Sequence, residues 1–261
     1  MYRLNPSEVL FSYDGELEGF FSLVFYAYAR HTMPSDIVPA GAVQPRLGQV
    51  VEEVQTNMEH AERVRLGLTR CAGYAAFDKV KRAFLSEQPG RELALLRYVE
   101  RAMNEGHRIH RDTGSDEVAA VDALVRRVAN ECEKMQQFAR FECLENGVYF
   151  ARVNPAANVV YLVMDHFVER FSTHAFMLYD EAHHVAGVYD QAQVTFVKTD
   201  EVFLPDKSED EARYQQLWKA FYDAVSNDQR YNPDLRRSFM PKRLWKNITE
   251  MSAAVSPLQV A

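Results

Sequence analysis

The chain has 261 residues, of which 47% are hydrophobic and 26% charged, and its net charge is −7. This composition is typical of a folded globular protein and excludes a disordered chain. No apolar run approaches the roughly 18 residues that a membrane span needs, and Met1–Pro6 lacks the basic and apolar regions of a secretory signal. We therefore expect a cytoplasmic protein without membrane contact.

The charge balance and the cysteines restrict the class of protein further. A net charge of −7 argues against a surface that coats nucleic acid throughout, but it permits a local basic patch. The three cysteines, Cys71, Cys132 and Cys143, are odd in number and widely spaced, with no CxxC pair. Neither a disulfide framework nor a cysteine zinc site is expected.

The start of the chain predicts a strand, a turn and a helix. Val9–Tyr13 is a short apolar run that ends at the turn dipeptide Asp14-Gly15. Apolar residues recur at helical spacing over Glu16–His31, with acidic residues at its start and basic ones at its end, as the helix dipole favours. Met33–Gly48 contains three prolines and two glycines and predicts a loop.

A helical block is expected over about 49–135 and a strand-rich block over about 137–200. The predicted helices of the first block are Val50–Thr69, Tyr74–Ser86, Arg91–Glu105 and Val118–Met135. The second block has β-rich runs at Phe138–Cys143, Val148–Val153, Ala175–Asp180, His184–Tyr189 and Val194–Lys198. Asn146-Gly147 predicts a hairpin between the first two runs, and Asn158–Phe171 has a helical pattern.

Helices are also expected over about 208–250, namely Ser208–Val225 and Asn232–Met251, followed by a tail at 252–261. Strands and helices are segregated along the chain, which favours an α+β fold rather than a doubly wound parallel sheet. We expect one α+β domain over 1–251. Its antiparallel sheet would combine Val9–Tyr13 with the strands between 138 and 198, flanked by helices and by a helical subdomain in the first half.

Motifs for known chemistry are absent from the sequence. No phosphate-binding, dinucleotide-binding, zinc-protease or serine-hydrolase motif occurs, and no metal or cofactor is expected. His183-His184 is interpreted as part of a polar turn, because adjacent residues on a strand point to opposite faces. His107, His110 and Asp112 share a helical face, but neighbouring arginines would repel a cation, so a solvated helix end is preferred.

Five polar residues are candidates for catalysis if the fold brings them into one pocket. His166 and Arg170 are one helical turn apart, and we expect their face to meet the sheet and Arg140. Tyr13 and Asp14 follow a strand, where a turn presents a phenol and a carboxylate. Such acid–base groups need a pocket and a shifted pKa. The alternatives are an ordinary Asx-type turn and a polar helix face packed on the sheet.

The clearest charge signal is the segment 230–246, which holds six cations and one carboxylate. The cations are Arg230, Arg236, Arg237, Lys242, Arg243 and Lys246. Interleaved with Tyr231, Phe239 and Trp245, they suit phosphate contact combined with base stacking. In the alternative interpretation, the aromatic residues anchor the segment to the core while the cations are solvated or pair with the acidic body.

Several stretches together resemble a bacterial family, the domain-of-unknown-function family 4130, from Phe11 to about Glu250. The stretches are Phe11–Phe20, Ala61–Val64, Ala83–Leu85, Glu131–Met135, Phe138–Phe141, Tyr149–Ala151, Asn154-Pro155, His166-Phe167, Arg170-Phe171, Asn232 and Met240–Trp245. Two positions depart from the family pattern. Leu244 replaces an aromatic residue and Cys132 replaces a frequent histidine, so no role of that histidine is carried over.

The resemblance implies a DNA context, through association alone. Members are labelled as DNA-metabolism or DNA-repair proteins. The domain also occurs fused ahead of a uracil-DNA-glycosylase-like domain, and it is encoded beside a radical-SAM protein. We therefore expect a nucleic-acid-binding accessory factor that works with a separately encoded radical-SAM or glycosylase-type repair enzyme.

Two other functions remain open from the sequence. One is an enzyme that acts on a nucleic-acid base or backbone through Tyr13, Asp14, Arg140, His166 and Arg170. The other is a protein-interaction module without DNA contact. The first requires these five side chains to converge in one cleft, and the second requires the cations of 230–246 to be neutralised by carboxylates of the protein.

Overall fold

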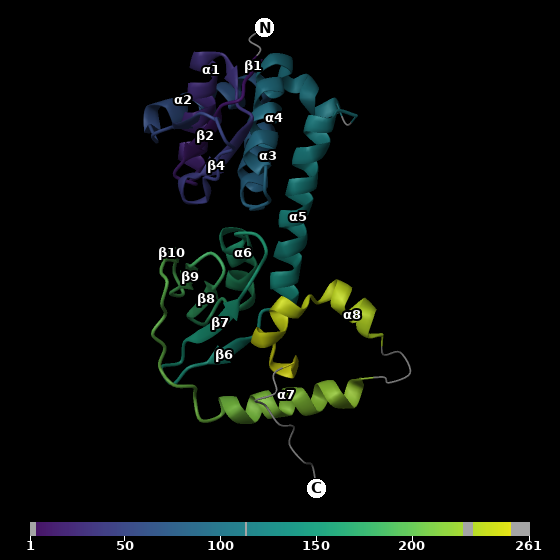
Figure 1. Ribbon diagram of the computed structural model, residues 1–261. Coiled ribbons are helices and arrows are strands. Elements are labelled where there is room, and N and C mark those ends of the chain that lie inside the picture. The colour runs from purple at the N-terminus through teal and green to yellow at the C-terminus, as the bar shows by residue number, and fades with distance from the viewer. Residues whose placement is uncertain (1–3, 113, 227–231, 252–261) are drawn as a thin grey trace. The chain divides into compact units, whose positions relative to one another are not determined.

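A computed structural model describes residues 4–112, 114–226 and 232–251 (Figure 1). The chain divides into two compact units, Met1–Val128 and Ala129–Ala261, and the division falls within helix α5 (Asp116–Phe138). The expected single domain over 1–251 stays a prediction.

A three-stranded parallel sheet organises the first unit. Strand β2 (Leu10–Tyr13) lies between β4 (Asp36–Pro39) and β5 (Val51–Glu53) and runs parallel to both. All four residues of β2 are buried, as expected for a central strand of a parallel sheet whose two faces are covered. The short strands β1 (Asn5–Pro6) and β3 (Thr32–Met33) form a second, parallel pair.

Helix α1 (Leu17–Arg30) connects β2 to β4 and is the crossover that a parallel pair requires. The Asp14 carboxylate accepts a hydrogen bond from the Glu16 backbone N–H at 2.9 Å and lies against the first turn of the helix. Gly19 leaves space for the Asp14 carboxylate, because a Cβ at position 19 would clash with Asp14 Oδ1. The predicted strand and helix are confirmed, but the expected membership of this strand in one antiparallel sheet is wrong.

The helices of the first unit pack around this sheet, with Phe11, Phe20, Leu68 and Leu95 in the core. Besides α1, they are α2 (Met58–Ala72), α3 (Tyr74–Phe84), α4 (Arg91–Glu105), the 3-10 helix η2 (Gly106–Arg111) and the start of α5.

All four helices predicted between 50 and 135 are confirmed, and the largest difference in their boundaries is at the start of the first. Residues 51–53 form β5 rather than helix, and α2 begins after Asn57, whose side chain accepts the His60 N–H at 3.0 Å. Residues 36–39 and the 3-10 helix η1 (Ala40–Ala42) replace part of the predicted loop.

The second unit is built on a five-stranded sheet of order β10-β9-β8-β7-β6. Its strands are β6 (Phe141–Cys143), β7 (Tyr149–Val153), β8 (Phe176–Asp180), β9 (Val185–Tyr189) and β10 (Val194–Lys198). The hairpin of β6 and β7 around Asn146-Gly147 is confirmed, and Gly147 has a φ of 78°, which glycine adopts readily.

This sheet is mixed, so the expected antiparallel arrangement is wrong at one pair. Strands β7 and β8 are parallel, whereas the pairs β6–β7, β8–β9 and β9–β10 are antiparallel. Helix α6 (Val160–Arg170) lies between β7 and β8 in the chain and provides their crossover. The helix was correctly predicted, but such a helix between adjacent strands also favours parallel pairing. Only the mixed α and β content of the predicted fold is confirmed.

The C-terminal elements are largely helical, as expected. They are α7 (Glu211–Val225), α8 (Pro233–Phe239) and the 3-10 helices η4 (Lys242–Asn247) and η5 (Thr249–Met251). The expected tail at 252–261 lies outside the described residues. Within the described ranges, no helix has both the length and the apolar character that crossing a membrane requires.

Candidate functional site

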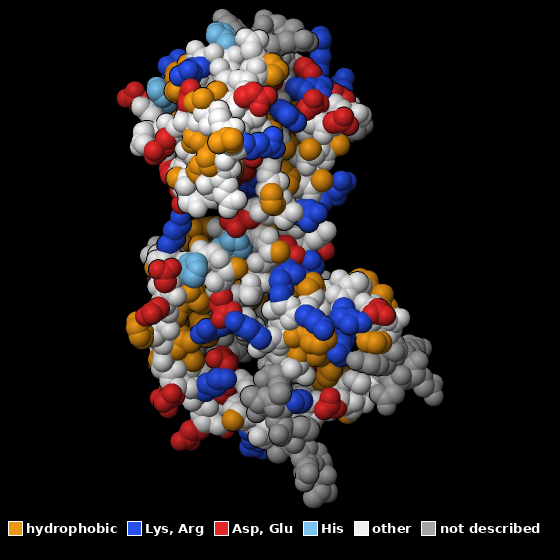
Figure 2. Space-filling view, in the orientation of Figure 1, with side chains coloured by type: hydrophobic (Ala, Val, Ile, Leu, Met, Phe, Trp, Pro, Cys, Tyr) orange, Lys and Arg blue, Asp and Glu red, His pale blue; other side chains and the backbone are white. Residues whose placement is uncertain are grey.

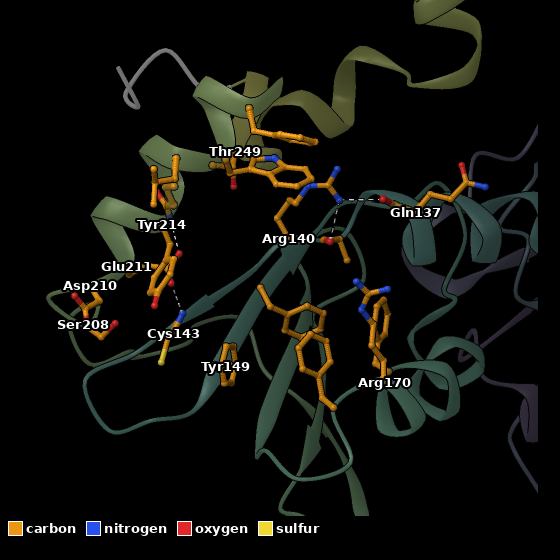
Figure 3. Close-up of a pocket in the computed structure, with 18 of the residues that line it drawn as sticks. Gln137, Arg140, Cys143, Tyr149, Arg170, Ser208, Asp210, Glu211, Tyr214 and Thr249 are labelled. Carbon is orange, nitrogen blue, oxygen red and sulfur yellow. Dashed lines mark hydrogen bonds between the residues drawn. The ribbon is translucent and has the colours of Figure 1, made fainter. Parts of the chain in front are cut away.

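A cavity of about 1120 Å³ lies in the second unit, with one wall formed by β6, β7 and the end of α6, and the other by α7 (Figure 3). Both walls are rich in aromatic rings. The aromatic side chains that line the cavity are Phe141, Tyr149, Phe167, Phe171, Tyr214, Trp218 and Phe221. On the sheet side the rings of Phe141 and Phe171 pack with their centroids 4.7 Å apart.

The α7 wall consists of side chains on one face of the helix. Tyr214, Leu217, Trp218 and Phe221 follow the spacing i, i+3, i+4 and i+7, which places them on one side. Their exposed fractions are 64%, 46%, 41% and 58%. These values are high for large apolar side chains on one helix face, and a contiguous apolar surface of this kind is characteristic of a binding site.

One end of α7 is attached to the sheet through Glu211. Its buried carboxylate accepts the Cys143 backbone N–H at 2.9 Å and the Gln215 Nε2 at 2.8 Å. Close by, the Ser208 N–H donates to the Cys143 carbonyl at 3.0 Å. Burial raises the pKa of Tyr149, and Cys143 and Glu211 raise it further, so this phenol stays protonated at neutral pH.

The middle of α7 is attached through Glu250. Arg140 binds this carboxylate with two contacts, Nη2–Oε1 at 2.7 Å and Nε–Oε2 at 3.2 Å, and Trp218 Nε1 donates to it at 2.9 Å. Burial alone would raise the pKa of Glu250, but the hydrogen bonds from Arg140 and Trp218 outweigh this and leave the pKa lowered. Arg140 also donates to the Gln137 and Ala139 carbonyls. Arg140 is therefore connected through Glu250 to Trp218 of α7, and its guanidinium is occupied by these contacts.

Arg170 differs from Arg140 in being unpaired. It lies exposed at the end of α6 and lines the cavity. Its guanidinium makes no ion pair or hydrogen bond to any other described residue. Figure 3 shows it rising from α6 beside the aromatic rings, on the side of the cavity that also carries Arg140. A guanidinium in this position suits an anionic group of a ligand.

The five predicted catalytic residues do not form one constellation within either unit. Tyr13 and Asp14 belong to the first unit, and Arg140, His166 and Arg170 belong to the second. Arg140 and Arg170 line the cavity, but His166 does not. The imidazole of His166 packs edge-on against Phe167 at 5.2 Å, with no hydrogen bond to a described residue. The geometry therefore gives His166 no acid–base partner.

Tyr13 is part of a buried polar cluster. Its hydroxyl donates to Glu92 Oε1 at 3.0 Å, and Arg91 Nε donates to the same oxygen at 2.9 Å. Burial raises the pKa of Tyr13, and the charge of Glu92 raises it further. Asp14 accepts hydrogen bonds from the Glu16 N–H, just before α1, and from the Thr56 hydroxyl. Both side chains therefore have structural partners, as the Asx-type turn would give.

The histidines whose sequence context resembles that of metal ligands make other contacts. His183 Nδ1 lies 2.6 Å from Asp180 Oδ2 within the turn between β8 and β9, in agreement with the polar-turn interpretation. His110 Nε2 is 2.7 Å from the Ala72 carbonyl. Among the residues that the structure describes, no three His, Cys, Asp or Glu side chains gather in a way that would hold a metal ion.

Most described cations of the basic segment, residues 232–246, have carboxylate or aromatic partners. The carboxylate pairs are Arg237–Asp234, Arg243–Glu131 and Lys246–Glu181. Arg236 lies over the Trp245 ring, 4.9 Å from its centroid. Lys242 is exposed and has no ion pair with a described residue. Arg230 and Tyr231 lie outside the described residues.

Figure 2 shows blue cationic and orange apolar side chains together over α8, where Leu235 and Phe239 are exposed. The predicted phosphate-binding surface thus has fewer unpaired cations than the sequence contains. Its role in nucleic-acid binding stays a prediction.

Three residues of the α7 wall, Tyr214, Trp218 and Phe221, are not among the site residues predicted from the sequence. Their helical spacing was the available signal, because it places three aromatic rings on one face of a helix beyond the last strand. Only the folded structure shows that this face lies opposite Phe141 and Phe171.

The geometry defines a mixed α and β protein with an aromatic cavity, whose lining includes Arg170 without a partner among the described residues. The model of a family described as a domain of unknown function, DUF4130, matches residues 89–250, which is more than half of the chain. The chain therefore belongs to the DUF4130 family. The match includes every cavity residue, and it confirms the resemblance from Pro89 onward rather than from Phe11. No curated protein and no solved structure gives a significant match.

Proposed function

We propose that this protein binds single-stranded nucleic acid and acts as an accessory factor in DNA metabolism or repair, bringing DNA to a separately encoded repair enzyme. One observation carries the proposal: the cavity combines two aromatic walls with the guanidinium of Arg170, which has no partner within the described ranges. Bases stack on the aromatic rings of single-strand-binding proteins, and cations contact the phosphates between them.

The aromatic walls favour an unpaired strand over a duplex. Stacking on an aromatic side chain contributes about 1–3 kcal/mol per base, but a base inside a duplex is covered by its neighbours and must first leave the stack. The cavity, at about 1120 Å³, is also larger than the roughly 300–1,000 Å³ of typical small-molecule pockets. It therefore has room for more than one nucleotide.

The electrostatics favour weak binding with a small salt dependence. Each phosphate neutralised on a single strand contributes about −0.7 to the slope of log affinity against log salt. Arg170 alone predicts a slope near that of one phosphate, whereas four cations of the basic segment acting together would predict about −3. The salt slope therefore distinguishes the cavity from the basic segment as the main contact.

The DNA context and the separate enzyme come from the family resemblance. In that family the domain occurs fused to a glycosylase-like domain or encoded beside a radical-SAM protein, and both associations suggest a partner that performs the chemistry. The cavity supports the binding part of this proposal.

Fluorescence anisotropy with a labelled 12-nucleotide strand, and with the same sequence as a duplex, tests the proposal. We expect the single strand to bind more tightly, and Arg170→Ala to weaken its binding about tenfold, because a charge-assisted hydrogen bond contributes roughly 1.5 kcal/mol or more. Arg213→Ala is the matched control, since Arg213 is exposed on α7, unpaired among the described residues and outside the cavity lining. Equal losses in both variants, or no binding of the single strand, would contradict the proposal.

A further inference from the structure

The outer surface of α2 in the first unit carries a second pocket. It has a volume of about 310 Å³ and lies against α1 and α4. Its lining includes Phe25, Arg63, Leu66, Gly67, Arg70 and Met103. Two arginines therefore border a small pocket that is otherwise mainly apolar, in a protein whose net charge is −7.

Both arginines of this pocket lack an acidic partner. Arg63 and Arg70 are exposed, and neither pairs with a carboxylate of the described residues. The Arg63 guanidinium lies 4.9 Å from the centroid of Phe25. Arg65, on the same helix, shows the contrast, because it forms two hydrogen bonds with Glu62. Arg63 and Arg70 are seven residues apart, which places their Cα atoms about 10 Å apart along the helix axis.

Gly67, midway between them, opens this face of the helix. A glycine inside a helix is destabilising relative to alanine, so its presence needs a reason. A Cβ there would meet Met103 Cε at 3.5 Å, an ordinary contact, so the packing of α2 within the chain does not require glycine. The missing side chain instead permits close approach of another backbone from outside. Leu66, beside it, is 49% exposed.

We propose that this face of α2 docks an acidic amphipathic helix of a partner protein. Carboxylates seven residues apart on that helix would pair with Arg63 and Arg70, and its apolar stripe would cover Leu66 and Gly67. Helices that bind in grooves use anchors at such i, i+3, i+4 and i+7 positions. Charge complementarity identifies the occupant, because two arginines that no described carboxylate neutralises attract an anionic surface.

The same geometry disfavours nucleic acid as the occupant. Two aromatic residues line the pocket, and the ring of one, Tyr28, is half-buried with its hydroxyl enclosed. The other, Phe25, already stacks on the His60 ring at 4.0 Å and contacts the Arg63 guanidinium. It therefore presents no free face to a base. This proposal concerns the first unit alone and does not depend on nucleic-acid binding in the second unit.

The test uses a synthetic 18-residue amphipathic helix of Leu, Ala and Glu, with glutamates seven residues apart beside a leucine stripe, labelled for anisotropy. We expect the wild-type protein to bind it. Arg63→Glu/Arg70→Glu should weaken binding at least tenfold, and the same peptide with lysines in place of its glutamates should bind that variant. Gly67→Leu should weaken binding at least fivefold, because its side chain fills the space for the partner backbone.

The matched control is Arg126→Glu/Arg127→Glu, which reverses two exposed arginines on α5 in the first unit that pair with no residue the structure describes. It should leave peptide binding unchanged, and circular dichroism should show every variant folded. Absence of wild-type binding, or equal binding by Arg63→Glu/Arg70→Glu, overturns the proposal. So does loss of oligonucleotide binding or of self-association in that variant, since either would assign the face to nucleic acid or to a second copy.

Discussion

The basic segment and the cavity of the second unit both combine cations with aromatic rings, but they differ in how many of their cations are paired. In the basic segment, Arg243 and Lys246 bind carboxylates, and Arg236 covers Trp245. In the cavity, Arg170 is unpaired among the described residues. The difference shows that a count of cations overestimates the charge available to a ligand, because neutralisation by neighbouring carboxylates is visible only in the folded structure.

The largest expected effect tests whether Arg243 in the basic segment is paired, and it is an effect on the stability of the protein. Glu131 is buried and accepts hydrogen bonds from Arg243, from Lys134 at 2.6 Å and from the Ala156 N–H at 3.0 Å. Arg243→Ala leaves this carboxylate short of a partner and should lower the free energy of unfolding by roughly 3 kcal/mol. Urea denaturation measures this value.

The control for this change is its neighbour Lys242, which is exposed and unpaired among the described residues. Lys242→Ala should alter the free energy of unfolding by less than about 0.5 kcal/mol. If Arg243→Ala keeps its stability but loses nucleic-acid affinity, Arg243 is a phosphate ligand and the comparison fails.

A smaller effect concerns pH and the Arg140–Glu250 pair. The pKa of Glu250 is lowered in the folded protein from its ordinary 4.5. A carboxyl group with a lowered pKa stabilises the fold above its unfolded pKa, and this stabilisation is lost as the pH falls through the folded pKa. The contribution is therefore complete at pH 7 and is lost progressively below pH 4.5.

The variant Glu250→Gln isolates this contribution. It should be about 2 kcal/mol less stable than wild type at pH 7, since a charge-assisted hydrogen bond contributes roughly 1.5–3 kcal/mol. The difference between the two proteins should shrink as the pH falls from 5 to 3, in urea denaturation series. A constant difference over this range would show that Glu250 acts by packing rather than by its charge.

The smallest effect concerns Tyr13. Tyr13→Phe removes one hydrogen bond to buried Glu92, while Arg91 keeps its own. We expect a loss of about 1 kcal/mol in the free energy of unfolding and unchanged nucleic-acid affinity. Thermal denaturation and anisotropy measure the two quantities. If the variant stays stable but loses nucleic-acid binding, or loses an enzymatic activity on nucleic acid, Tyr13 would have the role that the enzymatic alternative gives it.

Local signals in the sequence predicted the elements well. The Asn146-Gly147 turn fixed the β6–β7 hairpin, and helical spacing placed α2 to α5. The parallel sheet of the first unit was not predicted, because β4 ends in Pro39 within a proline-rich stretch and β5 has only three residues. Strands this short carry little periodicity, and their pairing with β2 depends on contacts remote in sequence.

The site was predicted less completely than the fold. Arg140 and Arg170, which the sequence grouped as candidates, both line the cavity, but their catalytic role stays a prediction. His166 was grouped with them by its helical spacing to Arg170, but a helical spacing of four residues does not ensure that both side chains reach the same cavity. The α7 wall comes from residues 214–221, and no local pattern connects these to Phe141 or Phe171.

The two tryptophans of the chain allow the most direct test of the central claim, because Trp218 lines the cavity and Trp245 lies in the basic segment. Titration of the 12-nucleotide strand into Trp245→Phe, where Trp218 is the sole reporter, should quench the fluorescence. In Trp218→Phe, where Trp245 reports, the emission should stay unchanged on titration. Quenching of Trp245 without quenching of Trp218 would place the strand on the basic segment and contradict the account.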